Sequence, residues 1–232
     1  MIKRANHKAI KGFTLIELMI AISILSLLLL TGSYTYSLMS SRWSKELGNF
    51  AIAEKNAKHI ELTQRLLEGI QSFIVVNPQK KPFFFFIGHN TSLLAVSQSG
   101  FFANEVSEIF RLSAVEKSSG LFDLVYQSKS TQNLLLKGTE QIIEFDQSLV
   151  LFSDLTQISF EYFGWRNIDE KTNDEQNNFA PFWQQSYSGI DKQYMPEKLT
   201  LTLVKNNKIL VMPIMLQTNV QSWLSPYINS DT

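Results

Sequence analysis

Apolar residues follow one another with little interruption over residues 13–30, and polar residues return only gradually after that. At 1.5 Å per residue, a helix of this length spans roughly 27 Å, close to the hydrocarbon core of a bilayer at about 30 Å. An extension through Tyr36 covers that thickness, and Tyr34, Tyr36, Arg42 and Trp43 suit the interface beyond it. The pattern predicts a membrane-spanning helix over residues 13–36.

Beyond Tyr36 the apolar residues recur at steps of three and four, which predicts that the helix continues with one apolar face. The positions on that face are Trp43, Leu47, Phe50, Ala53, Ala57, Ile60, Gln64, Leu67 and Ile70. No proline follows until Pro78, and isolated glycines weaken a helix without ending it. We expect one helix of about sixty residues, with an amphipathic half over residues 37–76. The alternative is a membrane anchor followed by an unrelated helix.

From residue 77 onward the chain changes to short runs with strand character, which predicts an α+β fold with a β-rich globular part over residues 77–232. The expected strands are Phe83–Ile87, Ser92–Ser97, Leu121–Gln127, Asn133–Lys137, Gln141–Phe145, Ser148–Phe152, Thr156–Phe163, Lys198–Val204 and Lys208–Leu216. Asn206 and Asn207 suit a hairpin turn because asparagine tolerates a positive φ. The run Asn104–Leu112 is expected to form a short capped helix.

The segment from Asn167 to Met195 is polar and lacks periodicity, so we expect a long surface connection there. Its acidic residues are Asp169, Glu170, Asp174 and Glu175. Their spacing does not match a calcium-binding loop with its required glycine, which favours a solvated acidic loop.

The charges are unevenly distributed, although the formal net charge is zero. Four basic residues and no acid precede the apolar run, which keeps the N-terminus cytoplasmic and exports the rest. Without residues 1–12 the chain holds 17 basic and 21 acidic residues, a net charge of −4. That balance gives no reason to expect a nucleic-acid partner. The absence of cysteine excludes disulfides and thiolate metal sites.

Glu17 is an ionisable residue inside the apolar run. A carboxylate near the centre of a membrane helix costs about 2.5–3.5 kcal/mol, so such a residue normally has a partner and a function. An ordinary signal peptide, cut near Thr31-Gly32-Ser33, is the competing interpretation. The length of the apolar run and the presence of Glu17 both count against it.

The run Lys11-Gly12-Phe13-Thr14-Leu15-Ile16-Glu17 strongly resembles the signal of type IV prepilins and type II secretion pseudopilins. The resemblance implies a pilin-like fold and cleavage by a prepilin peptidase between Gly12 and Phe13, followed by methylation of the new N-terminus at Phe13. Glycine suits that cut because a missing Cβ lets a protease approach the backbone. The resemblance also implies that Glu17 pairs with the terminal amine of a neighbouring subunit.

A second resemblance concerns the C-terminal half, which is similar to J-type minor pseudopilins. It rests on the aromatic run at residues 154–163, on Trp165 and Trp183, and on the Met195-Pro196 step before a late strand. Methionine stands here where that subtype usually has leucine, and the loop between the tryptophans is long.

No enzymatic motif occurs in the sequence, and the three histidines form no cluster with metal-ligand spacing. His59 is expected on the surface of the helix. We therefore expect no catalytic residue, no cofactor and no metal.

The favoured function is a minor pseudopilin at the tip of a periplasmic filament, anchored in the bacterial inner membrane with its C-terminal domain in the periplasm. Its expected partners are the prepilin peptidase, other minor pseudopilins or pilins, the inner-membrane assembly platform and membrane lipid. The alternatives are a minor pilin that primes a type IV pilus and a membrane-tethered periplasmic enzyme or ligand-binding domain.

Overall fold

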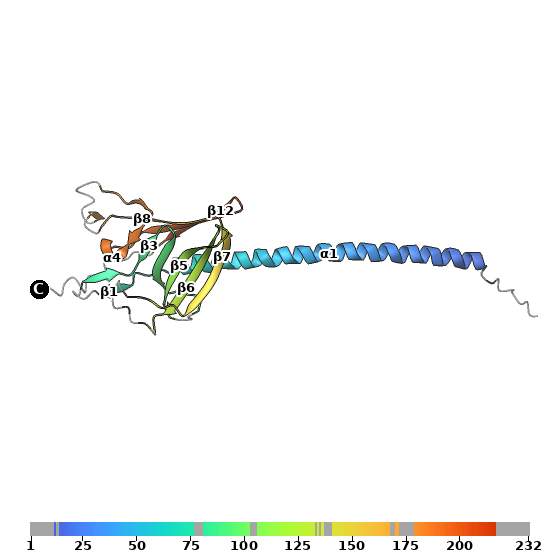
Figure 1. Ribbon diagram of the computed structural model, residues 1–232, viewed down its shortest axis with the longest axis horizontal. Helices are drawn as coiled ribbons and strands as arrows, with labels where there is room; N and C mark the ends of the chain where they lie inside the picture. Colours follow the sequence, from blue (N-terminus) through green and yellow to red (C-terminus); the bar gives the residue numbers. More distant parts are fainter. Residues whose placement is uncertain are drawn as a thin grey trace, which may run out of the picture. The chain divides into compact units, whose positions relative to one another are not determined.

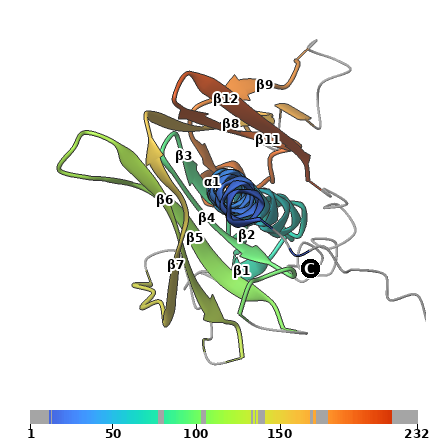
Figure 2. The same cartoon turned by 90° about the vertical axis from the view of Figure 1, so that its right-hand side faces the viewer.

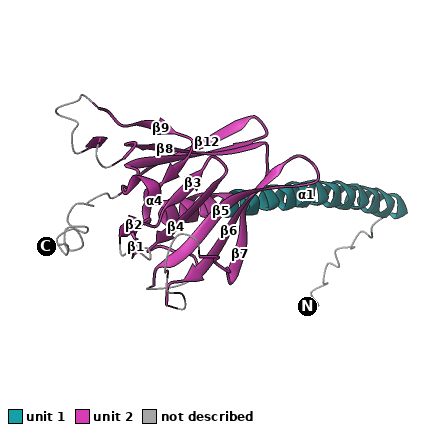
Figure 3. Cartoon of the chain, turned by 60° about the vertical axis from the view of Figure 1, so that its left-hand side comes forward, with its two compact units in different colours: residues 1–55 teal, residues 56–232 magenta. Residues whose placement is uncertain are grey.

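The computed structural model describes residues 12, 14–76, 81–102, 106–132, 134, 136, 141–167, 170–171 and 179–216. The chain divides into two compact units, residues 1–55 and residues 56–232 (Figure 3). The described part of the first unit consists of Gly12, Thr14 and the greater part of one helix. The second unit contains the end of that helix and the β-sheets (Figure 1). The chain therefore has the expected α+β, pilin-like architecture, a long N-terminal helix with antiparallel sheets.

Helix α1 (Leu15–Glu68) has 54 residues, which corresponds to about 81 Å. It ends at Glu68 rather than at residue 76. Gly69 follows, and a Cβ there would lie 2.7 Å from the hydroxyl oxygens of Ser97 and Ser99. The backbone at Gly69 therefore passes so close to Ser97 and Ser99 that a larger residue would clash there.

Within the described residues, the second unit holds one six-stranded, one four-stranded and one two-stranded sheet, in which every strand pair is antiparallel. The six-stranded sheet has the order β10-β3-β4-β5-β6-β7, the four-stranded sheet the order β12-β11-β8-β9, and the third pairs β1 with β2. The strands are β1 (Ile74–Val76), β2 (Pro82–Phe84), β3 (Ile87–His89), β4 (Ser92–Ser97), β5 (Glu108–Glu116), β6 (Phe122–Ser130), β7 (Gln147–Leu155), β8 (Gln157–Gly164), β9 (Phe182–Gln184), β10 (Tyr187–Ser188), β11 (Lys198–Lys205) and β12 (Lys208–Met215). The short helix α4 (Gly189–Lys192) follows β10.

The last turns of α1 lie between the two larger sheets, as the end-on view in Figure 2 shows. Leu66 and Leu67 are fully buried in one core cluster with side chains from both sheets, among them Leu112, Phe160 and Leu201. Ser97 also donates a hydrogen bond of 2.8 Å to the carbonyl oxygen of Leu66. The helix end thus fills the space between the inner faces of the sheets and forms the centre of the fold.

Six of the expected strands are confirmed. β4 has the predicted bounds, and β6, β7, β8, β11 and β12 overlap their predicted ranges. Asn206 and Asn207 form the β11–β12 turn with φ values of 49° and 61°. Phe84, Phe85 and Phe86 are buried, as expected for a core segment.

Some local predictions are wrong. Asn104–Leu112 does not form a helix, because from Glu108 onward it belongs to β5, where Ile109 and Phe110 are buried against different core clusters. Gln141–Phe145 is irregular, and Phe83–Ile87 is divided between β2 and β3. In the expected strand Asn133–Lys137, only residues 134 and 136 are described, and neither lies in a strand.

The helix face is also wider than the pattern predicts. Thr63 and Leu66 are fully buried although they lie off the predicted stripe, and Gln64 is exposed although it lies on it. His59 is half-buried rather than on the surface, and its Nδ1 forms a hydrogen bond with the carbonyl oxygen of Leu151. That carbonyl belongs to β7, an edge strand, so His59 covers a polar group that would otherwise be open to another strand.

The connection from Asn167 to Met195 is less of a surface loop than expected. It contributes β9, β10 and α4, and it buries Tyr187, Tyr194 and Met195. Lys192 lies 4.6 Å above the ring of Tyr187 and donates to Gln184, and burial lowers the pKa of this lysine. The connection is attached to the core by Tyr187, Tyr194 and Met195, which belong to the main hydrophobic cluster.

We expect Leu67→Ala to lower the free energy of unfolding of the globular unit by about 2–5 kcal/mol, because it leaves a cavity between the helix and both sheets. The matched control is Leu47→Ala on the same helix, where the side chain is 68% exposed and the expected change is below about 0.5 kcal/mol. Urea unfolding of the full chain in detergent, followed by tryptophan fluorescence, measures both. Equal effects of the two substitutions would contradict the described core.

Candidate functional site

The beginning of α1 holds Glu17 through Thr14. The backbone N–H and the hydroxyl of Thr14 each donate a hydrogen bond of 2.9 Å to Oε2 of Glu17. In return, the backbone N–H of Glu17 lies 3.4 Å from the Thr14 hydroxyl oxygen. This reciprocal arrangement is a capping box, in which the residue before the helix and the third helical residue satisfy each other's backbone donors. The positive end of the helix dipole further stabilises the carboxylate in this first turn.

Oε2 is the only carboxylate oxygen of Glu17 that accepts a hydrogen bond from any described residue. Oε1 accepts no hydrogen bond from these residues and can bind a further donor. A carboxylate in apolar surroundings gains most from a charged donor, since low dielectric strengthens the attraction. The geometry thus presents one oxygen that is already satisfied and one that can bind a cation.

Gly12 is exposed, and a Cβ built at this position would meet no atom within 4 Å. The fold of this chain therefore gives no steric reason for glycine there, so a requirement for glycine must come from a partner that approaches the backbone. Phe13 lies outside the described residues, as do residues 1–11.

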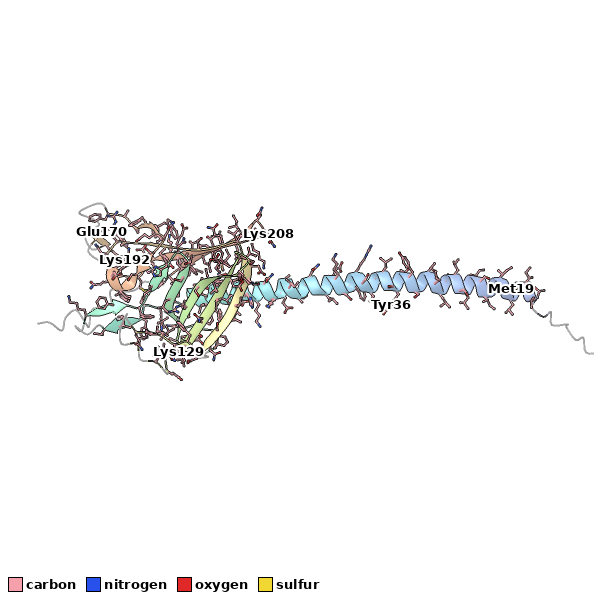
Figure 4. All side chains as sticks on the ribbon, in the orientation of Figure 1. Met19, Tyr36, Lys129, Glu170, Lys192 and Lys208 are labelled. Atoms are coloured by element: carbon pink, nitrogen blue, oxygen red, sulfur yellow. The ribbon has the colours of Figure 1, made fainter. Side chains whose placement is uncertain are left out.

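The apolar half of α1 is long and apolar enough, by length and composition, to cross a membrane, and none of its most apolar window is buried. Its side chains, among them Met19 and Tyr36, project from the helix on all sides in Figure 4. Because the helix lies near the N-terminus, a signal sequence would pass the same test. Length and composition therefore do not distinguish a membrane anchor from a signal sequence, and the sequence motif must decide between them.

Hydroxyl groups within this half bond back to the helix itself. Ser23 donates to the carbonyl oxygen of Met19 at 2.8 Å, and Thr35 donates to that of Thr31 at 2.8 Å. Such bonds satisfy polar groups where no water is present, so these hydroxyls are compatible with a hydrocarbon environment. Glu17 differs from them because it carries a charge and faces a much larger desolvation penalty.

Farther along α1, Trp43, Leu47 and Phe50 form an apolar stripe at steps of four and three. Their side chains are more than half exposed. Toward the end of the helix, Ile60 is half-buried and Leu67 is buried. The apolar face of α1 is thus buried near the end of the helix, where it packs against the sheets of the second unit.

The other sequence-predicted groups do not form a site. The described residues contain no group of three or more His, Cys, Asp or Glu side chains able to hold a metal ion. Glu170 lies 3.9 Å from Arg166 in an ion pair, while Asp169, Asp174 and Glu175 lie outside the described residues.

Residues 7–33 match a family model described as a prokaryotic N-terminal methylation motif. The match supports a pilin-like protein of the type IV pilin and pseudopilin class, and it fits single-pass membrane anchoring by the apolar half of α1. Such a motif also implies processing by a prepilin peptidase and assembly with other pilins. A search of curated proteins found no match.

Thr14 is the residue of this segment that the sequence analysis missed. The signal was present, because a threonine followed three residues later by glutamate, just before an apolar run, is the sequence pattern of a capping box. An interpretation of Glu17 from its charge alone omits Thr14, which positions its carboxylate.

We expect Thr14→Ala to loosen the first turn of α1 by about 1 kcal/mol, because it removes the hydroxyl that both donates to and accepts from Glu17. Amide hydrogen exchange of Glu17 in detergent should become about fivefold faster, whereas Thr14→Ser, which keeps the hydroxyl, should leave it nearly unchanged. Unaltered exchange in Thr14→Ala would show that the hydroxyl does not hold the carboxylate.

Proposed function

We propose that this chain is a minor pseudopilin of a type II secretion system, a non-enzymatic subunit of a periplasmic filament tip that assists protein export. In this proposal the prepilin peptidase cuts between Gly12 and Phe13 and methylates Phe13. The apolar half of α1 then anchors the subunit in the inner membrane, with its C-terminal unit in the periplasm, until it enters the filament.

The observation that carries the proposal is the segment from Gly12 to Glu17 at the start of an unburied apolar helix, within the matched residues 7–33. A generic anchor gains nothing from a carboxylate inside its apolar segment, a group that costs up to about 2.5–3.5 kcal/mol at the bilayer centre. A filament subunit does gain from it, because cleavage after Gly12 creates a positively charged amine, and the added methyl group leaves that charge in place. Each subunit then carries one cation and one anion that lie four residues apart, about 6 Å along the helix axis.

The pairing acts between subunits. Thr14 occupies Oε2 of Glu17 within the chain, and Oε1 is directed to no described partner. The amine of a neighbouring subunit can bind Oε1 without breaking the capping box. Because an unpaired charge in hydrocarbon is costly, only the register that brings amine and carboxylate together is favoured.

The features that suggest a J-type subunit lie beside one another in the four-stranded sheet. Trp165 follows β8 directly and donates a hydrogen bond of 3.0 Å to Glu197. The ring of Trp183, on β9, lies 5.3 Å from that of Phe163 on β8. Met195 and Pro196 lead into β11, which pairs with β8. Their proximity favours interpreting them as one pattern, and this pattern favours a secretion-system subunit over a type IV pilus subunit.

The partners in this proposal are the prepilin peptidase, the inner-membrane assembly platform, other minor pseudopilins and membrane lipid. No nucleic acid, metal or cofactor is part of it. Each partner other than the lipid recognises either the processed N-terminus or a surface that becomes buried in the filament.

The first test is the mass of the N-terminal peptide of the protein isolated from its native membrane. We expect a peptide that begins at Phe13 and carries one added methyl group, and we expect Gly12→Val to retain the leader because its Cβ hinders the peptidase. A start at Tyr34 would instead show an ordinary signal peptide, and an intact Met1 a simple anchor.

The second test is Glu17→Ala. Insertion and cleavage should remain, while the fraction of the protein in assembled filaments should fall about tenfold or more, because the neighbouring amine loses its buried partner. Glu46→Ala, which removes a carboxylate from the same helix beyond the apolar run, is the matched control and should assemble normally. The assembled fraction is measured by shearing and sedimentation; equal assembly of both variants would disprove the pairing.

A further inference from the structure

A lysine in the connection between β8 and β11 contacts two aromatic rings and a carboxylate at the same time. Nζ of Lys171 lies 4.6 Å from the ring centre of Tyr194 and 5.6 Å from that of Trp165. The same nitrogen lies 3.1 Å from Oε1 of Glu197. We call Trp165, Tyr194 and Glu197 the ammonium cage, because these three side chains together contact the charged group of the lysine.

The ammonium cage is held in place by contacts that do not involve the lysine. Trp165 and Tyr194 are 6% and 4% exposed and belong to the main hydrophobic cluster. The backbone N–H of Glu197 donates a hydrogen bond of 2.8 Å to the carbonyl oxygen of Phe163, and its carbonyl oxygen accepts one of 3.0 Å from Leu216. Nε1 of Trp165 also donates to Oε1 of Glu197 at 3.0 Å. The fold itself therefore orients both rings and the carboxylate.

This combination of groups selects a cation of a particular kind. The face of an aromatic ring attracts a cation, and the attraction grows when water is excluded. The side chains of Lys171 and Glu197 are each only 28% exposed, so solvent screens their ion pair less than it screens a pair on the open surface. A neutral apolar group could contact the rings but would leave the carboxylate without a counter-ion. The ligand that fits is a primary alkylammonium group.

Other lysines of the chain lie above aromatic rings but have different surroundings. Lys192 lies 4.6 Å from the ring centre of Tyr187 and donates hydrogen bonds to neutral oxygens. Lys198 lies 5.2 Å from the ring centre of Phe163. Within the part of the chain that the structure describes, neither lysine forms an ion pair with a carboxylate. The combination of two rings and a carboxylate thus distinguishes Lys171 from both.

The contact with the ammonium cage closes the connection between β8 and β11 at its base. Lys171 lies early in the connection, and Glu197 is the last residue before β11. Between them the chain supplies β9 to the edge of the four-stranded sheet and β10 to the edge of the six-stranded sheet. Glu170, next to Lys171, lies with Lys192 at the end of the second unit away from Lys208 (Figure 4). The lysine therefore fixes a segment on which both larger sheets depend.

We propose that Trp165, Tyr194 and Glu197 form a binding site for a primary alkylammonium group, and that Lys171 is its resident ligand. In this role Lys171 acts as a latch that holds the connection closed. Because the walls of the site are fixed without the lysine, removal of its side chain leaves a site that accepts a free alkylammonium ion. The inference does not depend on the proposed function, since none of these residues belongs to the N-terminal motif.

The test restores the missing group from solution. Lys171→Ala keeps Cβ and removes a fragment equivalent to n-propylammonium. The full chain in detergent is labelled with 5-fluorotryptophan and observed by ¹⁹F NMR, and Trp165→Phe identifies the resonance of Trp165 among those of the four tryptophans. We expect Lys171→Ala to shift this resonance, and n-propylammonium chloride to return it toward its original position with half-saturation on the order of 10 mM. Sodium chloride and propanol at the same concentrations should not.

Two further variants test the chemistry of the site. Lys198→Ala is the matched control, because it removes a lysine that lies above one ring without a carboxylate partner among the described residues. In this variant n-propylammonium should leave the resonances of Trp165 and Trp183 unchanged. Glu197→Gln, combined with Lys171→Ala, should weaken the binding of n-propylammonium about tenfold, because the charge that pairs with the ammonium group is lost.

The proposal is overturned if n-propylammonium does not restore the Trp165 resonance, if propanol restores it equally well, or if Lys198→Ala responds in the same way. Lys171→Met keeps the length of the side chain without its charge and decides the matter if Lys171→Ala does not fold. We expect this variant to shift the Trp165 resonance and not to respond to n-propylammonium, because the methionine fills the site. An unshifted resonance would show that no ammonium group lies on the ring.

Discussion

A single carboxylate placed in an apolar helix constrains this molecule more than any other feature. Glu17 needs a partner that the hydrocarbon cannot provide, and within the chain Thr14 satisfies only Oε2. The capping box also fixes the position of the carboxylate, because Thr14 caps the helix and Glu17 lies in its first turn. The capping box thus satisfies two backbone N–H groups at the helix start, while the charge of Glu17 has no counter-ion among the described residues, which is the condition for selective association inside a membrane.

The rest of the chain is organised by the helix that begins there. An α-helix that is apolar all round has no preferred face, so its first half can be surrounded by lipid or by other helices. Near its end, the same helix must bury one side against protein. Leu66 and Leu67 do so between two sheets, and Gly69 allows the backbone to pass close to Ser97. The glycine after the helix thus has a packing role, in addition to the conformational freedom that usually explains glycine at this position.

Sequence reasoning was reliable where one physical effect dominated. Periodicity identified α1, and strict alternation identified β11. The turn at Asn206 and Asn207 followed from backbone sterics alone. It failed for residues 104–112, because β5 is buried on both faces at Ile109 and Phe110 and therefore lacks a clear period of two. It also failed for β9 and β10, whose two or three residues are too few to show a pattern. The class of the candidate site could be predicted because it depends on a short stretch of sequence. The role of Thr14 was missed because it depends on the hydrogen bonds that Thr14 and Glu17 exchange with each other's backbone N–H groups.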